Sequence, residues 1–205
     1  MGVLEDKSRA RTFYRFLSKV YDQVNPVFWN ESMRDEALGM LEISEGDRVL
    51  DVGCGTGFAT AGLLEHTPHV DGLDQSEHQL EKARQKDGLA GVDFVRGDAE
   101  NLPYTDDTFD AVWSSGSIEY WPTPVDALAE ARRVTKPGGR VLVVGPRRPK
   151  GRVFGAIADS IMLFYDEEEA TRMFEEAGWA GIEHTLMGSE YVEDDAIVTL
   201  ARNPE

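Results

Sequence analysis

The sequence predicts an α/β fold, a doubly wound and mostly parallel sheet of seven strands within a single domain of 205 residues. Three observations predict it. Apolar runs bounded by turn residues alternate with segments of helical period through most of the chain. A glycine-rich loop joins the first apolar run to the next helical segment. Hydrophobic residues make up 41% of the chain, which is enough for one substantial core.

The elements follow in a regular order. Strands are predicted at the apolar runs 47–52, 69–74, 92–96, 109–114 and 139–145. Helices are predicted between them at 58–66, 76–87 and 124–135, with Ser76 and Thr123 as N-caps and Pro137-Gly138-Gly139 ending the last. Because repeated strand–helix–strand units form right-handed parallel crossovers, these segments build one Rossmann-like sheet. An acidic helix at 166–177 and strands near 181–187 and 195–201 complete it.

We expect the single domain, residues 1–205, to have three parts. Two predicted helices, roughly 5–20 and 31–43, form an N-terminal helical cap over residues 1–45 that can cover the ligand site. Residues 46–145 form the ligand-binding core. Residues 146–205 supply substrate-side helices and the C-terminal strands. No Pro-, Gly- or Ser-rich linker divides the chain.

Acidic residues dominate the charge. The chain has 38 acidic and 21 basic residues, a net charge of −17, and only six lysines. This charge opposes nonspecific contact with nucleic acid and destabilises the compact state unless salt screens it. We therefore expect a salt-rich cytoplasm, as in halophilic archaea; the alternative is an ordinary acidic protein. The sequence contains no run of about 18 apolar residues, the length needed to span a membrane. The charged N-terminus predicts a cytoplasmic protein without a signal peptide.

The glycine loop is the most informative motif. Residues 49–57 read VLDVGCGTG, with Gly-x-Gly-x-Gly spacing, and Phe58 stands where a dinucleotide fingerprint requires its last glycine. The loop resembles that of class I S-adenosylmethionine (SAM) methyltransferases rather than an NAD loop. The resemblance implies SAM as cofactor, with Asp51 holding its methionine end. It also implies backbone contacts from Gly53, Cys54, Gly55 and Gly57. The alternative is a tight strand-to-helix turn without a ligand.

Other predicted cofactor residues follow the next strands. Asp74 ends the second strand, where a carboxylate can accept both hydroxyls of a ribose. Gln75 follows at the edge of the adenine pocket. Asp98 resembles the family residue that accepts from the adenine amino group, with the Ala99 N–H on the ring; the alternative for Asp98 is an Asx turn. Ser114 ends the fourth strand and is expected beside the sulfonium.

Further motifs narrow the resemblance. The N-terminal Tyr21-Asp22-x-x-Asn25 resembles an element of ubiquinone and menaquinone C-methyltransferases. Segments 73–80, 97–103, 116–122 and 158–164 resemble the plastid 2-methyl-6-phytyl-1,4-benzoquinol methyltransferases. These resemblances imply methyl transfer to a ring carbon of a prenylated benzoquinol or naphthoquinol. The plant enzymes carry a further membrane-anchoring tail that has no counterpart in residues 1–205, so the resemblance leaves permanent membrane attachment open.

The acceptor side needs a proton acceptor, because a quinol carbon becomes nucleophilic when a neighbouring hydroxyl loses its proton. Glu119 and Tyr120, just past the fourth strand, are the predicted catalytic residues; Asp22 and His78 are further candidates. The alternative for Glu119 is a surface carboxylate. No metal site is predicted. The predicted acceptor-binding residues are Tyr21, Ser117, Ile157 and Ile161.

Residues 147–165 combine a basic start with apolar residues at helical spacing. We expect a lid over an apolar prenyl chain, with the basic cluster touching anionic lipid headgroups in transient, peripheral contact at the inner membrane face. The alternative is a helix that packs in the core, with the basic residues at its start exposed to solvent. The basic cluster consists of Arg147, Arg148, Lys150 and Arg152, followed by the apolar pair Val153 and Phe154.

Other functions stay open at this stage. A SAM-dependent methyltransferase could act on another lipid or a small polar molecule, and a non-catalytic SAM-binding protein would carry the same cofactor motifs. An NAD oxidoreductase is disfavoured by Phe58. No pattern predicts the oligomeric state.

Overall fold

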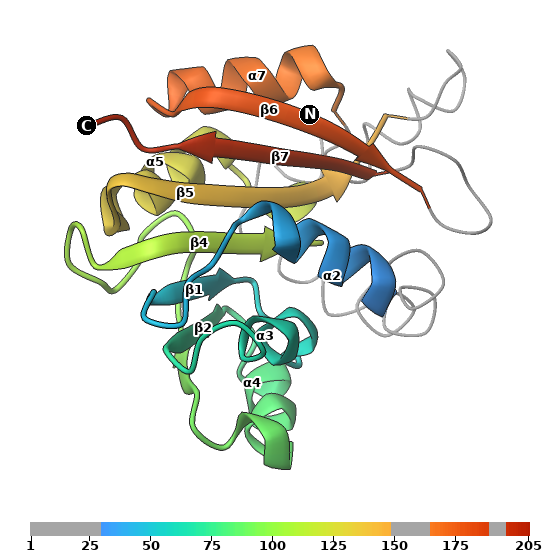
Figure 1. Ribbon diagram of the computed structural model, residues 1–205, viewed down its shortest axis with the longest axis vertical. Helices are drawn as coiled ribbons and strands as arrows, with labels where there is room; N and C mark the ends of the chain where they lie inside the picture. Colours follow the sequence, from blue (N-terminus) through green and yellow to red (C-terminus); the bar gives the residue numbers. More distant parts are fainter. Residues whose placement is uncertain (1–29, 149–164, 189–195) are drawn as a thin grey trace.

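The computed structural model describes residues 30–148, 165–188 and 196–205. These residues form a seven-stranded sheet in the order β3-β2-β1-β4-β5-β7-β6 (Figure 1). Neighbouring strands from β3 to β5 are parallel, and β7 runs antiparallel to both β5 and β6. The predicted fold class is confirmed. The strands are β1 (Val49–Val52), β2 (Val70–Asp74), β3 (Asp93–Arg96), β4 (Phe109–Ser115), β5 (Thr135–Pro146), β6 (Ala180–Met187) and β7 (Ala196–Arg202).

Helices cover both faces of the sheet. The described helices are α2 (Glu31–Met40), α3 (Phe58–Leu63), α4 (Glu77–Arg84), α5 (Pro124–Val134) and α7 (Glu167–Glu176), with short 3-10 turns η2 (Asp87–Leu89) and η3 (Ile118–Tyr120). One core packs α5 and α7 against the sheet, and the other packs α2 and α3 against the opposite face. Because successive strand residues point to opposite faces, Val49 joins the second core and Leu50 the first. All four β1 residues are buried, as expected for a central parallel strand.

The start of β5 differs from the prediction. Helix α5 ends at Val134, and Thr135 already pairs with Phe109 of β4. Pro137-Gly138-Gly139 therefore lies inside an irregular start of the strand, where the register shifts before Arg140 pairs with Ala111. Gly138 has a positive φ of 76°, and its N–H donates to the carbonyl of Asn203. The Pro-Gly-Gly segment thus forms a kink in β5 and not a stop for α5.

The predicted caps Ser76 and Thr123 occupy the N-cap positions of α4 and α5, but neither side chain makes a capping hydrogen bond. The side chain of Asn30 caps α2, and Asp166 with Glu169 forms a capping box on α7. The two residues of the capping box each accept a backbone N–H of the other, which satisfies two donors at the helix start.

Of the predicted N-terminal cap, the structure describes only the second helix, α2. It buries Met33, Ala37 and Leu38 in the core that it shares with α3. Arg34 joins the two helices: its guanidinium donates to the carbonyl of Phe58 at 3.1 Å and lies 4.9 Å from the centre of that ring. Helix α2 therefore supports the helix that follows the glycine loop, and a covering role over the ligand site stays a prediction. No helix in the described ranges is long and apolar enough to cross a membrane.

Candidate cofactor and acceptor site

The candidate site lies where β1, β2 and β4 end, because the carboxyl ends of parallel strands meet at one edge of a sheet. The loop after β1 is joined to β2 by backbone bonds. The N–H groups of Gly53 and Cys54 both donate to the carbonyl of Leu73, at 2.7 and 3.0 Å, and Gly57 N–H donates to the carbonyl of Cys54 at 2.8 Å. The loop therefore has a fixed shape.

The three loop glycines have positive φ values of 75°, 53° and 80°, but they serve different purposes. A Cβ on Gly53 would lie 2.4 Å from Cβ of Ser117, and one on Gly57 would lie 2.4 Å from a methyl of Leu89. A Cβ on Gly55 would meet nothing within 4 Å. The outer glycines are thus required by packing inside the protein, and Gly55 presents open backbone to a ligand.

Asp74 connects the end of β2 with the glycine loop. Its carboxylate accepts the N–H of Gly55 at 2.9 Å and the N–H of Ser76 at 2.8 Å. Burial raises the pKa of Asp74, and these two hydrogen bonds counteract the rise. A carboxylate has about four acceptor sites, so a ribose diol can be accepted beside the two backbone bonds. Asp74 thus lies next to Gly55, and its contact with a ribose stays a prediction.

Asp51 lies inside the protein at the end of β1. It is 1% exposed, and its Oδ2 accepts the hydroxyl of Thr60 on α3 at 2.6 Å. Burial raises its pKa to about 7, hydrogen bonds from Thr60 lower it, and the charge of Asp74 raises it. The sequence analysis did not single out Thr60. The signal that could have indicated Thr60 is its position, a polar residue within the short helix that follows the glycine loop.

The predicted adenine-side residues lie on the turn after β3. Asp98 is exposed, its Oδ1 accepts the N–H of Glu100 at 3.1 Å, and its carbonyl accepts the N–H of Asn101 at 3.0 Å. This is the Asx turn that was the alternative interpretation, and its bond to Glu100 uses one carboxylate oxygen. The side chain of Gln75 is exposed, and its carbonyl accepts a bond from Arg96. A cofactor contact by Asp98, Ala99 or Gln75 stays a prediction.

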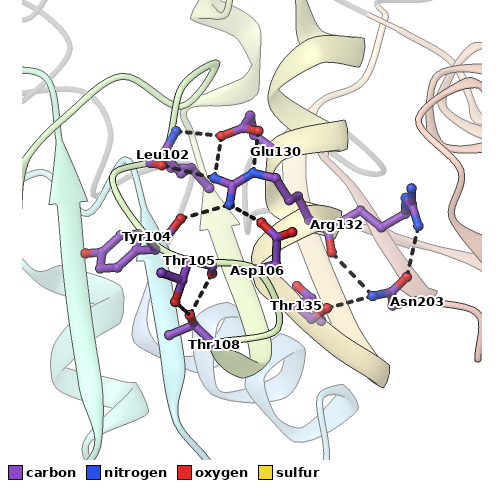
Figure 2. A network of polar contacts seen from close by, with 10 residues as sticks. Leu102, Tyr104, Thr105, Asp106, Thr108, Glu130, Arg132, Thr135 and Asn203 are labelled. Carbon is purple, nitrogen blue, oxygen red and sulfur yellow. Dashed lines mark hydrogen bonds and ion pairs between the residues drawn. The ribbon is translucent and has the colours of Figure 1, made fainter.

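A polar network holds this adenine-side loop on α5 (Figure 2). Arg133 donates to the carbonyls of Leu102 and Tyr104 at 3.0 and 2.8 Å, and pairs with Glu130 and Asp106. Glu130 also accepts the N–H of Leu102 at 2.8 Å. The carboxylates raise the pKa of Arg133 and keep its charge. The loop between β3 and β4 is therefore positioned by side chains of α5, the helix that follows β4 in the chain.

Two serines connect the end of β4 with the glycine loop. Ser114 is buried, and its hydroxyl lies 2.7 Å from the hydroxyl of Ser117, which also donates to the carbonyl of Val52 at 3.3 Å. Ser117 was predicted on the acceptor side. The observed contacts of Ser117 are with Ser114, Val52 and the start of the glycine loop, because Gly53 has no side chain and leaves room for that of Ser117.

Glu119 lies on η3 and is only 1% exposed, so the alternative of a surface carboxylate is wrong. Its charge contributes to a raised pKa of Tyr165, whose main cause is complete burial. The Tyr165 hydroxyl and the Ile118 side chain both lie close to Gly145 of β5. A Cβ added to this glycine would clash with both of them. Tyr165 was not singled out from the sequence. Tyr120 is partly buried, and His78 is exposed on α4.

Some of the remaining predicted residues lie within the described ranges, and the others lie outside them. Cys54 is buried with a raised thiol pKa, mainly through desolvation, so it contributes shape and backbone but no thiolate chemistry. Arg147 and Arg148 pair with Glu167 and Glu169, each at 2.8 Å, so α7 compensates two of the four predicted basic charges. The predicted residues that lie outside the described residues are Tyr21, Asp22, Lys150, Arg152, Val153, Phe154, Ile157 and Ile161.

Comparisons with known proteins agree with this architecture. A family model described as "Methyltransferase domain" matches residues 50–143. A demethylmenaquinone methyltransferase of Bacillus subtilis is 32% identical over 77% of this chain and 71% of the relative. The chain belongs to the SAM-dependent methyltransferases. The family cofactor is SAM, and the open backbone at Gly55 with the carboxylates of Asp51 and Asp74 fits a cationic nucleoside ligand.

More similar relatives are longer. The rice chloroplastic 2-methyl-6-phytyl-1,4-hydroquinone methyltransferase 1 is 48% identical over 92% of this chain, which spans 58% of the rice protein. The Arabidopsis thaliana protein of the same description is 45% identical over the same share, and the chain spans 57% of it. A Haloferax volcanii methyltransferase solved with the Trm112 activator shares the fold, with a TM-score of 0.79 at 21% identity over 96% of this chain and 98% of that one.

Proposed function

We propose that this methyltransferase transfers the methyl group of SAM to a ring carbon of a prenylated benzoquinol or naphthoquinol. The supporting observation is the extent of the similarity to the plant hydroquinone methyltransferases. It covers 92% of the chain at 43–48% identity, whereas the general methyltransferase model matches only residues 50–143. The similarity therefore includes segments that the cofactor alone does not require.

On the cofactor side, each residue has a defined part. Asp74 accepts the ribose hydroxyls beside the Gly55 backbone, and Asp51 faces the cationic methionine end. Ser114 and Ser117 hold the glycine loop from β4 through their contact and the bond to the Val52 carbonyl. When bound, SAM supplies a methyl group that is already activated for transfer. The protein therefore has to align the acceptor and exclude water rather than activate the donor.

On the acceptor side, we propose Glu119 as the proton acceptor. A buried carboxylate beside Ile118 and the Tyr165 ring can accept a proton from a quinol hydroxyl in surroundings that suit an apolar ring. The deprotonated oxygen raises the electron density at the neighbouring ring carbon. That carbon would take the methyl group from bound SAM, with S-adenosylhomocysteine as the leaving product. The carbon then loses its proton to solvent, and protonated Glu119 returns a proton to the quinol oxygen, which restores the aromatic quinol. Tyr120 is proposed as its neighbour at the ring.

The finer points on location and partners are also proposals. We propose a cytoplasmic enzyme that contacts the inner membrane face transiently to collect its apolar acceptor. Since Arg147 and Arg148 are paired with α7, this contact would depend on Lys150, Arg152 and the apolar pair Val153 and Phe154. Tyr21, Ile157 and Ile161 are proposed to line the acceptor.

Glu119→Gln tests the acceptor side. The variant keeps the shape of the side chain but cannot accept the proton, so turnover of a prenylated quinol should fall by about 100-fold or more. Binding of S-adenosylhomocysteine, measured by calorimetry, should stay within about twofold of the unaltered protein. Unchanged turnover would remove Glu119 from catalysis. Methylation of polar acceptors in preference to quinols would favour the alternative that the enzyme acts on another small molecule, and binding without any turnover would favour a non-catalytic SAM-binding protein.

A further inference from the structure

The hydrogen bond between Thr60 and Asp51 joins two side chains that have almost no contact with solvent. Thr60 is 0% exposed and Asp51 is 1% exposed, and the distance from the hydroxyl to Oδ2 is 2.6 Å. This length is typical of a hydroxyl that donates to an ionised carboxylate. The pair lies between the end of β1 and the helix that follows the glycine loop, next to the backbone on which the cofactor is expected.

Thr60 makes this bond although local preferences favour other arrangements. A β-branched residue loses rotamer freedom in a helix, and its hydroxyl commonly bonds a carbonyl of the preceding turn. In α3 the hydroxyl instead reaches across to the strand and contacts Asp51. The bond therefore depends on the packing of α3 against β1, and it fixes one oxygen of the carboxylate.

The charged surroundings do not otherwise favour an ionised Asp51. Asp74 acts on it with a charge of the same sign, and the Cys54 thiol is kept neutral by its raised pKa. Helix α3 carries no titratable side chain. On the other elements packed against β1, Asp71 pairs with Arg48, Asp110 with Lys136, and Arg34 with Asp35. The remaining charged side chains of α2, Glu31 and Glu36, are exposed.

We propose that Thr60 is a positioning residue that holds Asp51 as an oriented carboxylate, so that the cationic methionine end of SAM meets an anion at neutral pH. The inference rests on the proposed function in taking SAM as the ligand. Burial raises the pKa of Asp51 to about 7, and the bonds from Thr60 lower it. Without the hydroxyl the pKa rises further, a larger share of Asp51 is protonated near neutral pH, and cofactor affinity falls there most.

Thr60→Val removes the hydroxyl and nearly keeps the volume, and Thr60→Ser restores the hydroxyl without the methyl. Thr67→Val is the matched control, because Thr67 is also buried and its hydroxyl donates to the carbonyls of Glu45 and Asp47 at 3.0 and 2.7 Å. Calorimetry with SAM at about pH 6.5 and about pH 8.5 gives the ratio of each variant's affinity to that of the unaltered protein. The ratio cancels titration of the ligand itself.

For Thr60→Val we expect a loss of about tenfold or more at the lower pH and a clearly smaller loss at the higher pH. Thr60→Ser and Thr67→Val should show ratios near one at both. A loss that is equal at both pH values, or one that Thr67→Val shares, would overturn the role of Thr60. Circular dichroism checks each fold, and Thr60→Ala serves the same comparison if the valine variant does not fold. If the unaltered protein binds no SAM, the proposed function itself fails.

Discussion

Asp51→Asn should stabilise the ligand-free protein at alkaline pH while it weakens SAM binding. The pKa of Asp51 rises from 3.8 to about 7 on folding, chiefly through burial. A group whose pKa is raised in the folded state contributes stability below its unfolded pKa and loses that contribution as the pH rises through the folded pKa. The folding free energy that ionised Asp51 costs therefore grows between about pH 4 and about pH 7 and is fully present above about pH 7.

The size of this cost follows from the shift. About three pKa units at 1.36 kcal/mol each give a cost on the order of 4 kcal/mol above about pH 7. An asparagine has nearly the same shape and its amide oxygen can still accept the Thr60 hydroxyl, but it carries no charge. The free energy of unfolding of Asp51→Asn minus that of the unaltered protein should therefore increase by a few kcal/mol between about pH 5 and about pH 8.5.

Urea unfolding at the two pH values and constant KCl measures this difference, and the comparison between variants cancels the titration of all other groups. Glu81→Gln is the control, because Glu81 is exposed on α4; its effect should not change with pH. If the difference between Asp51→Asn and the unaltered protein is the same at both pH values, Asp51 is not a strained buried carboxylate. A role of Asp51 toward a cationic ligand would then have no energetic support.

Three further experiments test the site and the net charge. Asp74→Ala should weaken SAM binding by about 1.5–3 kcal/mol, because hydrogen bonds to a charged group are lost; calorimetry that shows unchanged affinity would remove Asp74 from the site. Gly53→Ala should destabilise the fold, since its Cβ would lie 2.4 Å from that of Ser117, whereas Gly55→Ala, with open space around it, should affect SAM affinity more than the urea midpoint; the reverse order of effects would contradict the distinction between them. Thermal melts should show a higher midpoint in molar than in dilute KCl, because counter-ions screen a net charge of −17; a midpoint that does not rise with salt would contradict the expected adaptation to a salt-rich cytoplasm.

The sequence predicted the α/β fold and the positions of most strands because these signals are local and strong. The apolar run of β1 is buried on both faces, and a glycine loop that leads into a helix has few structural alternatives. The placement of Asp74 next to Gly55 followed from the parallel topology. The position of β5 was predicted less well, because Pro137-Gly138-Gly139 is a helix-stop signal that also fits a kinked strand.

The parts that could not be predicted depend on contacts between distant residues. Glu119 is buried, and its charge acts on Tyr165, which lies far along the chain. The ion pairs of Arg147 and Arg148 form only when α7 folds back beside the end of β5. Thr60 gained its partner from the packing of α3 on β1. Sequence patterns identify residue types suited to a site, but such pairings depend on tertiary structure.

The methylated product shows whether the enzyme is a quinol C-methyltransferase. Purified protein in molar KCl is incubated with methyl-labelled SAM and a mixture of prenylated benzoquinol, prenylated naphthoquinol and their short-chain analogues, and the products are identified by mass spectrometry. We expect a prenylated quinol that gains one methyl group on a ring carbon, which fragmentation distinguishes from a methyl group on oxygen. Label found only on oxygen, or only on a non-quinol acceptor, would contradict it.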